Sequence, residues 1–231
     1  MKYWAVIPAA GIGSRMQSDT PKQYLKIFDK TILEHTLDRF INHPQITGVA
    51  VAVSSEDEYW QALDIKSDKP MIITTGGMER CHSVLSALQS LDEYAEPQDW
   101  VLVHDAARPC LRSLDIDKLI NEVSEHPVGG LLALPVKDTM KRSDGNAITE
   151  TVERNNLWHA LTPQMFRLTD LRSALEKILE KDLIVTDEAQ AMEMMQQMPL
   201  LVEGHMDNIK ITHPQDLELA THYLKAQGYV K

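Results

Sequence analysis

Short apolar runs alternate with amphipathic segments along most of this chain. Five runs of strand length are mainly apolar, at residues 3–7, 48–53, 71–74, 100–103 and 129–134. Between them, apolar side chains recur at helical spacing in residues 31–42, 79–91 and 114–125. Strands that alternate with helices favour a mostly parallel sheet flanked by helices, so we expect an α/β, Rossmann-like fold.

The capping signals refine this expectation at two points. Thr31 and Glu34 have the spacing of a capping box, which predicts where the first long helix begins. Thr212 and Gln215 have the same spacing and predict the start of a last helix that ends near Gln227. The remaining expected elements are helices at residues 55–63, 168–180 and 187–198 and strands at residues 200–203 and 208–211.

Residues 135–156 break the alternation. Two short extended runs, residues 139–142 and 147–152, flank an Asp-Gly-Asn turn signal and predict a β-hairpin. The hairpin is polar and would be marginally stable alone, so it is either a mobile surface feature or an arm that packs on a second subunit. Because no repeat or linker occurs elsewhere, we expect one domain over residues 1–231 with residues 135–156 as a protruding arm.

Composition narrows the class of protein. The 231 residues carry a formal net charge of −11, which argues against a general nucleic-acid binder because such proteins show a basic face. Apolar runs of membrane-spanning length and a signal-peptide pattern are both missing, so we expect no membrane association. Cys81 and Cys110 stand outside any C-x-x-C motif, which favours a reducing, cytoplasmic setting.

The most informative stretch follows the first strand. Small residues and two cations come in close succession there, at Pro8, Ala9, Ala10, Gly11, Gly13, Arg15 and Lys22. Small side chains let backbone N–H groups approach anionic oxygens, and the cations add full charge. The spacing does not fit a P-loop, and Met16 stands where a dinucleotide-binding loop needs its third glycine. A phosphate-binding loop is therefore expected, with a plain tight turn as the alternative.

Other candidate residues also follow predicted strands. Gly76 and Gly77 come after the third strand, and Asp105 comes after the fourth. Ligands of parallel sheets bind outside the carboxyl ends of the strands, where all these residues should meet.

These motifs resemble those of nucleotidyltransferases that join a nucleoside monophosphate to a sugar phosphate. The most specific resemblance is to the 2-C-methyl-D-erythritol 4-phosphate cytidylyltransferase family of the non-mevalonate isoprenoid pathway. It covers nearly the whole chain in order and rests on AAGIGSRM from Ala9, PKQY from Pro21, GG at Gly76, RCHSV from Arg80, VHDAARP from Val103, DTMKR from Asp138, TVERNNLWHALTPQ from Thr151, TDEA from Thr186 and DNIKIT from Asp207.

The resemblance implies the transfer of CMP from CTP to a polyol phosphate, with loss of pyrophosphate. For this reaction we expect Arg15 and Lys22 to stabilise the reacting phosphates. Asp105, a carboxylate at a strand end, is the best candidate ligand for Mg²⁺, with Asp207 as a weaker second carboxylate. A phosphomonoester is already largely a dianion at neutral pH, so catalysis should rest on positioning and charge rather than on a general base.

The resemblance also implies the substrate contacts. The nucleotide would lie against Pro8, Ala9, Ala10, Gly11, Gly13, Gly76, Gly77, Arg80 and Ser83. The sugar phosphate would contact Asp105, Arg108, Thr162, Thr186 and Lys210, with Thr139 and Arg154 reaching in from the arm of a homodimer partner. Met78 departs from the acidic residue that some family members have there, which leaves its contribution open.

Three other functions compete with this interpretation. A ribitol-5-phosphate cytidylyltransferase would share the core and differ in the polyol, although the segment from Thr151 favours methylerythritol phosphate. A catalytically silent nucleotide-binding protein should lack Arg15, Lys22 or Asp105, and all three are present. A dinucleotide-dependent oxidoreductase is disfavoured by Met16.

Overall fold

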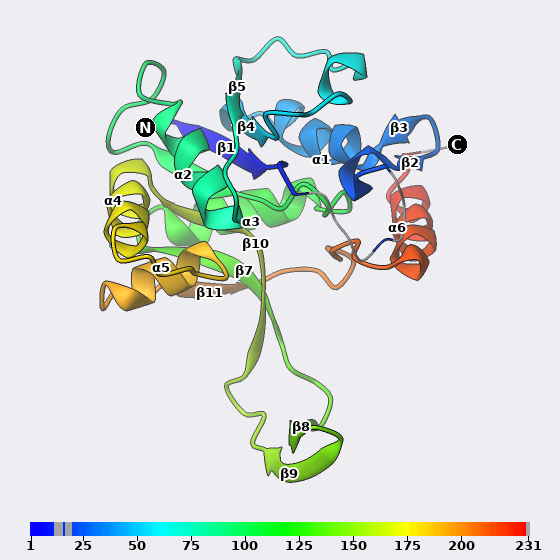
Figure 1. Cartoon of the computed structure of the whole chain (residues 1–231), viewed down its shortest axis with the longest axis vertical. Helices are drawn as coiled ribbons and strands as arrows, with labels where there is room; N and C mark the ends of the chain where they lie inside the picture. Colours follow the sequence, from blue (N-terminus) through cyan, green and yellow to red (C-terminus); the bar gives the residue numbers. More distant parts are fainter. Residues whose placement is uncertain (12–15, 17–19, 230–231) are drawn as a thin grey trace.

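A seven-stranded sheet forms the centre of the molecule (Figure 1). The structure, a computed structural model, describes residues 1–11, 16 and 20–229. The strand order is β11–β7–β10–β6–β1–β4–β5, and only β10 runs antiparallel to its neighbours. The strands are β1 (Tyr3–Pro8), β4 (Ile46–Val53), β5 (Met71–Thr75), β6 (Trp100–Val103), β7 (Gly129–Pro135), β10 (Trp158–Arg167) and β11 (Leu200–Glu203). The predicted mostly parallel sheet is confirmed.

Helices cover both faces of this sheet. α1 (Ile32–Ile41) and α3 (Ser113–Val123) contact one face, whereas α2 (Arg80–Gln89), α4 (Leu168–Leu179) and α5 (Glu188–Met194) lie on the other. α6 (Pro214–Ala226) packs beside the start of α1 and the small pair β2 (Lys26–Ile27) and β3 (Lys30–Thr31). In the described part of the chain, none of the helices has the length and apolarity that crossing a bilayer requires.

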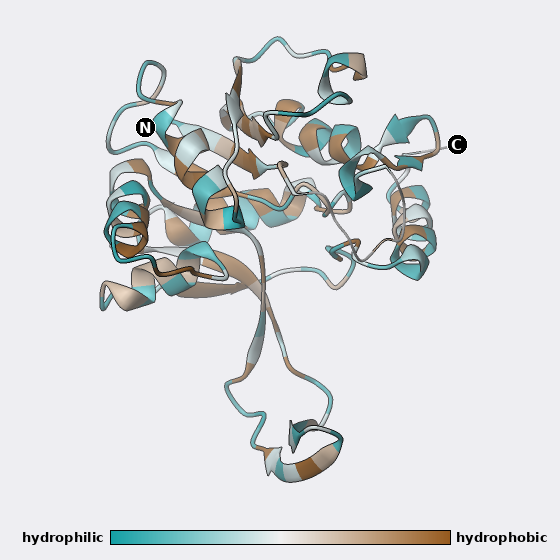
Figure 2. Ribbon diagram, in the orientation of Figure 1, coloured by the Kyte–Doolittle hydropathy of each residue, from teal (hydrophilic) through white to brown (hydrophobic). Residues whose placement is uncertain are grey.

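Strand β1 shows how the sequence builds this three-layer core. Its side chains alternate between the faces, with Trp4 and Val6 packed toward α2 and Ala5 and Ile7 packed toward α1. All four side chains are buried. Figure 2 shows the apolar colour that predominates in the central strands. Burying a large apolar side chain stabilises a fold by about 1.5–3 kcal/mol. This double burial fixes β1 in the middle of the sheet, so the loop after Pro8 starts from a rigid support.

The predicted hairpin is confirmed as a protruding arm. β8 (Met140–Asp144) and β9 (Ala147–Val152) pair antiparallel around Gly145, whose φ of +54° suits a hairpin turn. The hairpin is almost entirely exposed, and Figure 1 shows it held well away from the body by the chain that continues β7 and β10. The arm, residues 135–156, therefore buries little within its own chain.

Helix starts were predicted with mixed success. The Thr31–Glu34 capping box is confirmed, since each residue caps the other at the start of α1. The start predicted at Thr212 is wrong by one residue, because the Asp216 carboxylate accepts hydrogen bonds from both Thr212 N and His213 N at 2.8 Å. Pro214 then occupies the first helical turn, where its missing N–H costs nothing.

Two predicted elements are absent or much reduced. Residues 55–63 form only the short 3₁₀ helix η3 (Trp60–Ala62), because Asp57 Oδ1 accepts from Tyr59 N and Trp60 N at 2.9 and 2.8 Å and competes with a longer helix. Residues 208–211 do not form a strand; Ile211 N makes a single backbone hydrogen bond of 2.9 Å to Ala107 O.

Helix α5 ends at Met194, earlier than predicted, since Gln196 has a positive φ of 61°.

Candidate active site

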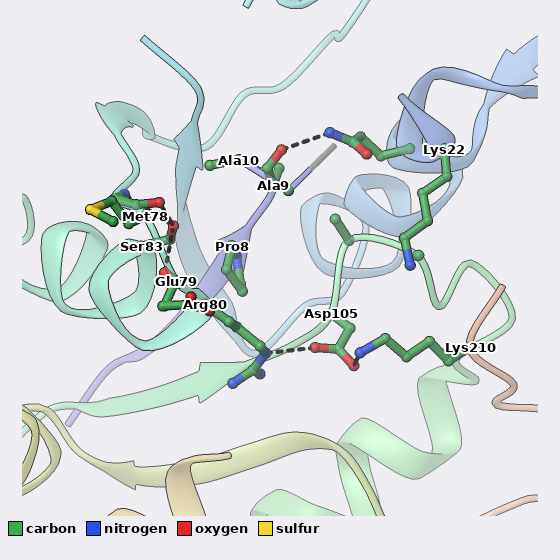
Figure 3. A pocket seen from close by; sticks show the side chains of 15 residues that line it. Pro8, Ala9, Ala10, Lys22, Met78, Glu79, Arg80, Ser83, Asp105 and Lys210 are labelled. Atoms are coloured by element: carbon green, nitrogen blue, oxygen red, sulfur yellow. Dashed lines mark hydrogen bonds and ion pairs between the residues drawn. The ribbon is translucent and has the colours of Figure 1, made fainter. Parts of the chain in front are cut away.

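A pocket lies at the carboxyl ends of β1, β5 and β6 (Figure 3). Several residues that the sequence predicted line it, namely Pro8, Ala9, Ala10, Gly11, Lys22, Gly77, Arg80, Ser83, Asp105 and Lys210. Residues that were not assigned to the site also line it, namely Gln23, Met78, Glu79, Ala106 and Ala107. The predicted convergence of strand ends is therefore present. Gly13 and Arg15 lie outside the described residues, so their assignments stay predictions.

The turn after β5 explains its two glycines. A Cβ on Gly76 would lie 2.5 Å from Ala10 Cβ and 2.8 Å from Ser83 Oγ. Ser83, on the first turns of α2, accepts a hydrogen bond of 3.2 Å from Gly77 N. Only a residue without a side chain can approach Ala10 this closely. Ser83 thus supports the turn that forms one wall of the pocket.

The loop after β1 is held by a residue that sequence reasoning missed. Gln23 is buried in the 3₁₀ helix η2 (Lys22–Tyr24), and its Nε2 donates a hydrogen bond of 2.8 Å to Ala9 O. Its neighbour Lys22 extends its Nζ to Ile211 O at 3.1 Å. Gln23 stands inside the PKQY motif, but nothing in the sequence says which backbone group its amide would find.

Asp105 is the electrostatic centre of the pocket. Its Oδ1 lies 2.9 Å from Arg80 Nε, and its Oδ2 lies 3.0 Å from Lys210 Nζ and 3.3 Å from Arg108 Nε. Figure 3 shows Arg80 and Lys210 reaching Asp105 from opposite sides. Burial alone would raise the pKa of the Asp105 carboxyl, but the charges of Arg80, Lys210 and Arg108 lower that pKa well below its usual range. Asp105 is therefore an anion that holds three cations in place.

Glu188 completes this arrangement and was not predicted. It is buried at the start of α5 and accepts from Arg80 Nη1 at 2.6 Å and from Nη2 at 3.1 Å. Burial raises the pKa of the Glu188 carboxyl, although the Arg80 charge opposes this. The sequence places Glu188 inside TDEA, more than 100 positions from Arg80, so the pairing has no local signal.

Asp105 does not fit the predicted role of magnesium ligand in this arrangement. Both of its oxygens already face cationic donors. Within the described residues, no three His, Cys, Asp or Glu side chains come together as a metal site. Asp207, the weaker candidate, lines a different hollow, where its Oδ2 accepts from Arg112 Nε at 2.8 Å and Arg112 Nη2 at 2.6 Å. We therefore assign no step to a metal held by this chain.

The remaining predicted contacts lie beside the pocket or away from it. Arg108 is buried and donates from Nη1 to Asn208 O at 2.8 Å. Thr162 is buried on β10, next to Asp105. Thr186 is exposed, and its hydroxyl lies 3.1 Å from Gln190 Oε1. Arg108, Thr162 and Thr186 are not among the lining residues of the pocket.

Thr139 and Arg154 stand on the arm. Both are exposed, and Arg154 Nη1 donates to the carbonyl oxygen of Lys137 within the arm itself. Because the arm points away from the body, one chain does not bring these two residues to its own pocket (Figure 1). Their predicted role therefore requires a second chain.

Comparison with known proteins identifies close relatives. Residues 3–226 match the family model described as 2-C-methyl-D-erythritol 4-phosphate cytidylyltransferase. A protein of that name from Pseudomonas putida (strain GB-1) is 54% identical over 218 residues, which cover 94% of this chain and 93% of the relative. One from Vibrio vulnificus (strain CMCP6) is 53% identical over 224 residues, covering 96% and 94%.

A similar structure has been solved by crystallography. The 2-C-methyl-D-erythritol 4-phosphate cytidylyltransferase of Francisella tularensis aligns with a TM-score of 0.85 at 39% identity, covering 97% of this chain and all (100%) of that one. The matched regions include the pocket and the arm, so the similarity extends to both of the features described above.

Proposed function

Because this chain belongs to the 2-C-methyl-D-erythritol 4-phosphate cytidylyltransferase family, we propose that it transfers CMP from CTP to 2-C-methyl-D-erythritol 4-phosphate. The products are pyrophosphate and 4-diphosphocytidyl-2-C-methyl-D-erythritol, an isoprenoid precursor. The observation that carries the proposal is one pocket in which Lys22, Arg80 and Lys210 adjoin a small-residue loop. The relatives do not favour ribitol 5-phosphate as the acceptor.

The reaction needs a nucleophile, a stabilised transition state and a leaving group. The second pKa of a phosphomonoester is about 6, so the attacking phosphate oxygen is largely ionised at neutral pH. It attacks the α-phosphorus of CTP as the bond to the pyrophosphate oxygen breaks. The chain's part is to hold both anions in line and to offset their charge, which are the two largest protein contributions to phosphoryl transfer.

Charge is available on two sides of the pocket. Lys22, with Arg15, would stabilise the five-coordinate phosphorus and the departing pyrophosphate. Lys210 and Arg108 would hold the attacking phosphate, since both contact Asp105 and are aligned by it. Arg80, which also pairs with Glu188, would hold Asp105 and the turn at Gly76 and Gly77 in fixed relative positions.

The nucleotide side of the pocket should select CTP over ATP, GTP and UTP. Backbone and small side chains form part of the wall there, where Ala10 and Ser83 lie against the Gly76 turn. We expect this wall to fit a pyrimidine better than a purine. Uracil presents an acceptor where cytosine has an amino donor, which would leave buried polar groups unpaired. Turnover measured with each triphosphate at equal concentration checks this preference, and equal rates with all four would contradict it.

Magnesium remains part of the proposal as a companion of the nucleotide. The oxygens of a triphosphate can themselves bind Mg²⁺, which usually keeps several waters and few protein ligands. The proposed reaction therefore needs no free carboxylate from this chain. A cytoplasmic setting is also proposed, supported by Cys81 and Cys110, which are free and buried.

The active unit is proposed to be a homodimer with shared sites. The arm is polar and exposed, and it carries Thr139 and Arg154 away from the body of its own chain. In a closed two-fold dimer, each arm would lie over the partner's sheet. Arg154 would then add a cation to the polyol-phosphate side of the neighbouring pocket.

Replacing Asp105 by asparagine should lower kcat/KM for methylerythritol phosphate by on the order of 10²-fold. The change removes the anion that Arg80, Arg108 and Lys210 share, so the three cations repel one another. The Mg²⁺ concentration for half-maximal rate should stay the same, because the proposed reaction places Mg²⁺ on the triphosphate and not on Asp105. Asp92→Asn, at an exposed pair with Arg172, is the matched control. A shifted magnesium requirement would return the metal role to Asp105.

A further inference from the structure

The loop after β6 contains a fully buried histidine that the proposed chemistry does not use. His104 is 0% exposed and packs against the ring of Phe40, with 5.2 Å between the ring centroids. Its Nε2 lies 3.0 Å from Arg108 O, and its Nδ1 lies 2.9 Å from Thr162 Oγ1. One ring thus connects the two ends of the Asp105–Arg108 turn to β10.

The partners of His104 determine where its proton is. A carbonyl oxygen only accepts, so Nε2 must carry the hydrogen that faces Arg108 O. Burial lowers the pKa of His104 to about 4, so the ring is neutral at neutral pH. In a neutral ring the other nitrogen only accepts. Nδ1 therefore takes its hydrogen bond from the Thr162 hydroxyl.

The Thr162 hydroxyl has no second proton to offer. Its one hydrogen points to His104 Nδ1, and its oxygen accepts from Asp105 N at 3.2 Å. The backbone of Thr162 continues the network, since its carbonyl accepts from Asn208 Nδ2 at 2.7 Å and Asn208 O accepts from Arg108 Nη1 at 2.8 Å. The backbone of Asp105 and the guanidinium of Arg108 are therefore tied to β10 from two directions.

We infer that His104 and Thr162 are positioning residues that hold Asp105 and Arg108 for the polyol phosphate. Thr162 acts through His104 and Asp105 and does not donate a hydrogen bond to the substrate. The substrate contact that the family resemblance implies for Thr162 is then limited to accepting a hydrogen bond, since the hydroxyl hydrogen is committed to His104 Nδ1. This positioning role rests on the proposed function for its kinetic consequences, whereas the proton position on His104 stands independently of the substrate.

Kinetics of His104→Gln, Thr162→Val and the double variant test the inference. Gln retains a donor for Arg108 O but loses the acceptor for Thr162, and Val retains the shape of Thr without its hydroxyl. Each single change should raise KM for methylerythritol phosphate by on the order of tenfold, because a polar group is left unpaired. The Kd for CTP alone should change less than about threefold. The double variant should be no worse than the poorer single variant, because both changes break one network.

Two further variants sharpen this test. Thr162→Ser keeps the hydroxyl and should stay close to wild type, whereas His222→Gln, at an exposed position on α6, controls for the histidine change. If Thr162 contacts the substrate directly, Thr162→Val raises KM while His104→Gln does not, and the inference is overturned. Wild-type protein that releases no pyrophosphate with this acceptor would instead contradict the proposed function.

The position of the ring proton of His104 can be measured in the wild-type protein, without turnover and without a variant. In ¹⁵N NMR spectra of the wild-type protein, His104 should show the Nε2–H tautomer and should not titrate between about pH 5.5 and 8. Its ring signals are assigned by correlation with the backbone resonances of residue 104, because burial also lowers the pKa of His35 and of His43. An Nδ1–H tautomer, or titration of every histidine near pH 6.5, would overturn the assignment.

Discussion

Lys22→Ala is expected to lower kcat by on the order of 10²-fold or more while the Kd for methylerythritol phosphate changes little. Lys22 lies on the nucleotide side of the pocket, between the loop after Pro8 and Ile211. Its charge should act most strongly when negative charge develops on the departing pyrophosphate. Removing one such stabiliser typically costs 10²–10³-fold in rate. The sequence predicts the same loss for Arg15→Ala.

Steady-state kinetics with both substrates varied measures this effect. Lys26→Ala is the matched control, since it removes an exposed lysine only four positions along the chain, on β2. The control should keep wild-type kcat. If the Lys22→Ala protein keeps kcat and only its KM for the polyol phosphate rises, Lys22 binds the polyol phosphate and does not stabilise the departing pyrophosphate. That result would contradict the proposed role.

Mixing two inactive variants should restore activity if the arm completes the partner's site. Arg15→Ala and Arg154→Ala are unfolded together and refolded. When Arg154 acts on the partner, each mixed dimer has one site with both defects and one with neither. About half of the dimers are mixed and one of their two sites works, so activity should recover to roughly a quarter of wild type.

No activity should return if Arg154 acts within its own chain, because every site in the mixture then keeps one defect. Arg142→Ala is the control for the arm itself, because Arg142 pairs with Glu150 on the exposed hairpin at 2.5 Å. That variant should be active without mixing, which separates the loss of Arg154 from damage to the arm.

Most of the sheet could be predicted because its strands are buried on both faces. β4 and β6 read as continuous apolar runs, and such runs stand out from the amphipathic helices between them. β10 was not predicted, although it lies in the middle of the sheet. It contains Pro163, which argues against a central strand. Its pairing with β7 is irregular between Ala160 and Gln164, so the proline stands where the ladder is interrupted.

The site was predictable to the extent that it lies at strand ends. The loop after β1, the glycine turn and Asp105 each follow a strand, and the topology brings them together. The side chains that align them could not be predicted in the same way. Gln23, Glu188 and His104 act through hydrogen bonds or ion pairs whose partners are remote or depend on loop conformation. Periodicity and spacing carry no signal for such contacts.

The proposed function is tested most directly by pyrophosphate release from CTP with 2-C-methyl-D-erythritol 4-phosphate and Mg²⁺, compared with release with ribitol 5-phosphate under the same conditions. We expect release of one pyrophosphate for each 4-diphosphocytidyl-2-C-methyl-D-erythritol formed, with little or no release when ribitol 5-phosphate is the acceptor. Release that requires ribitol 5-phosphate, or no release with either acceptor, would contradict the proposed function.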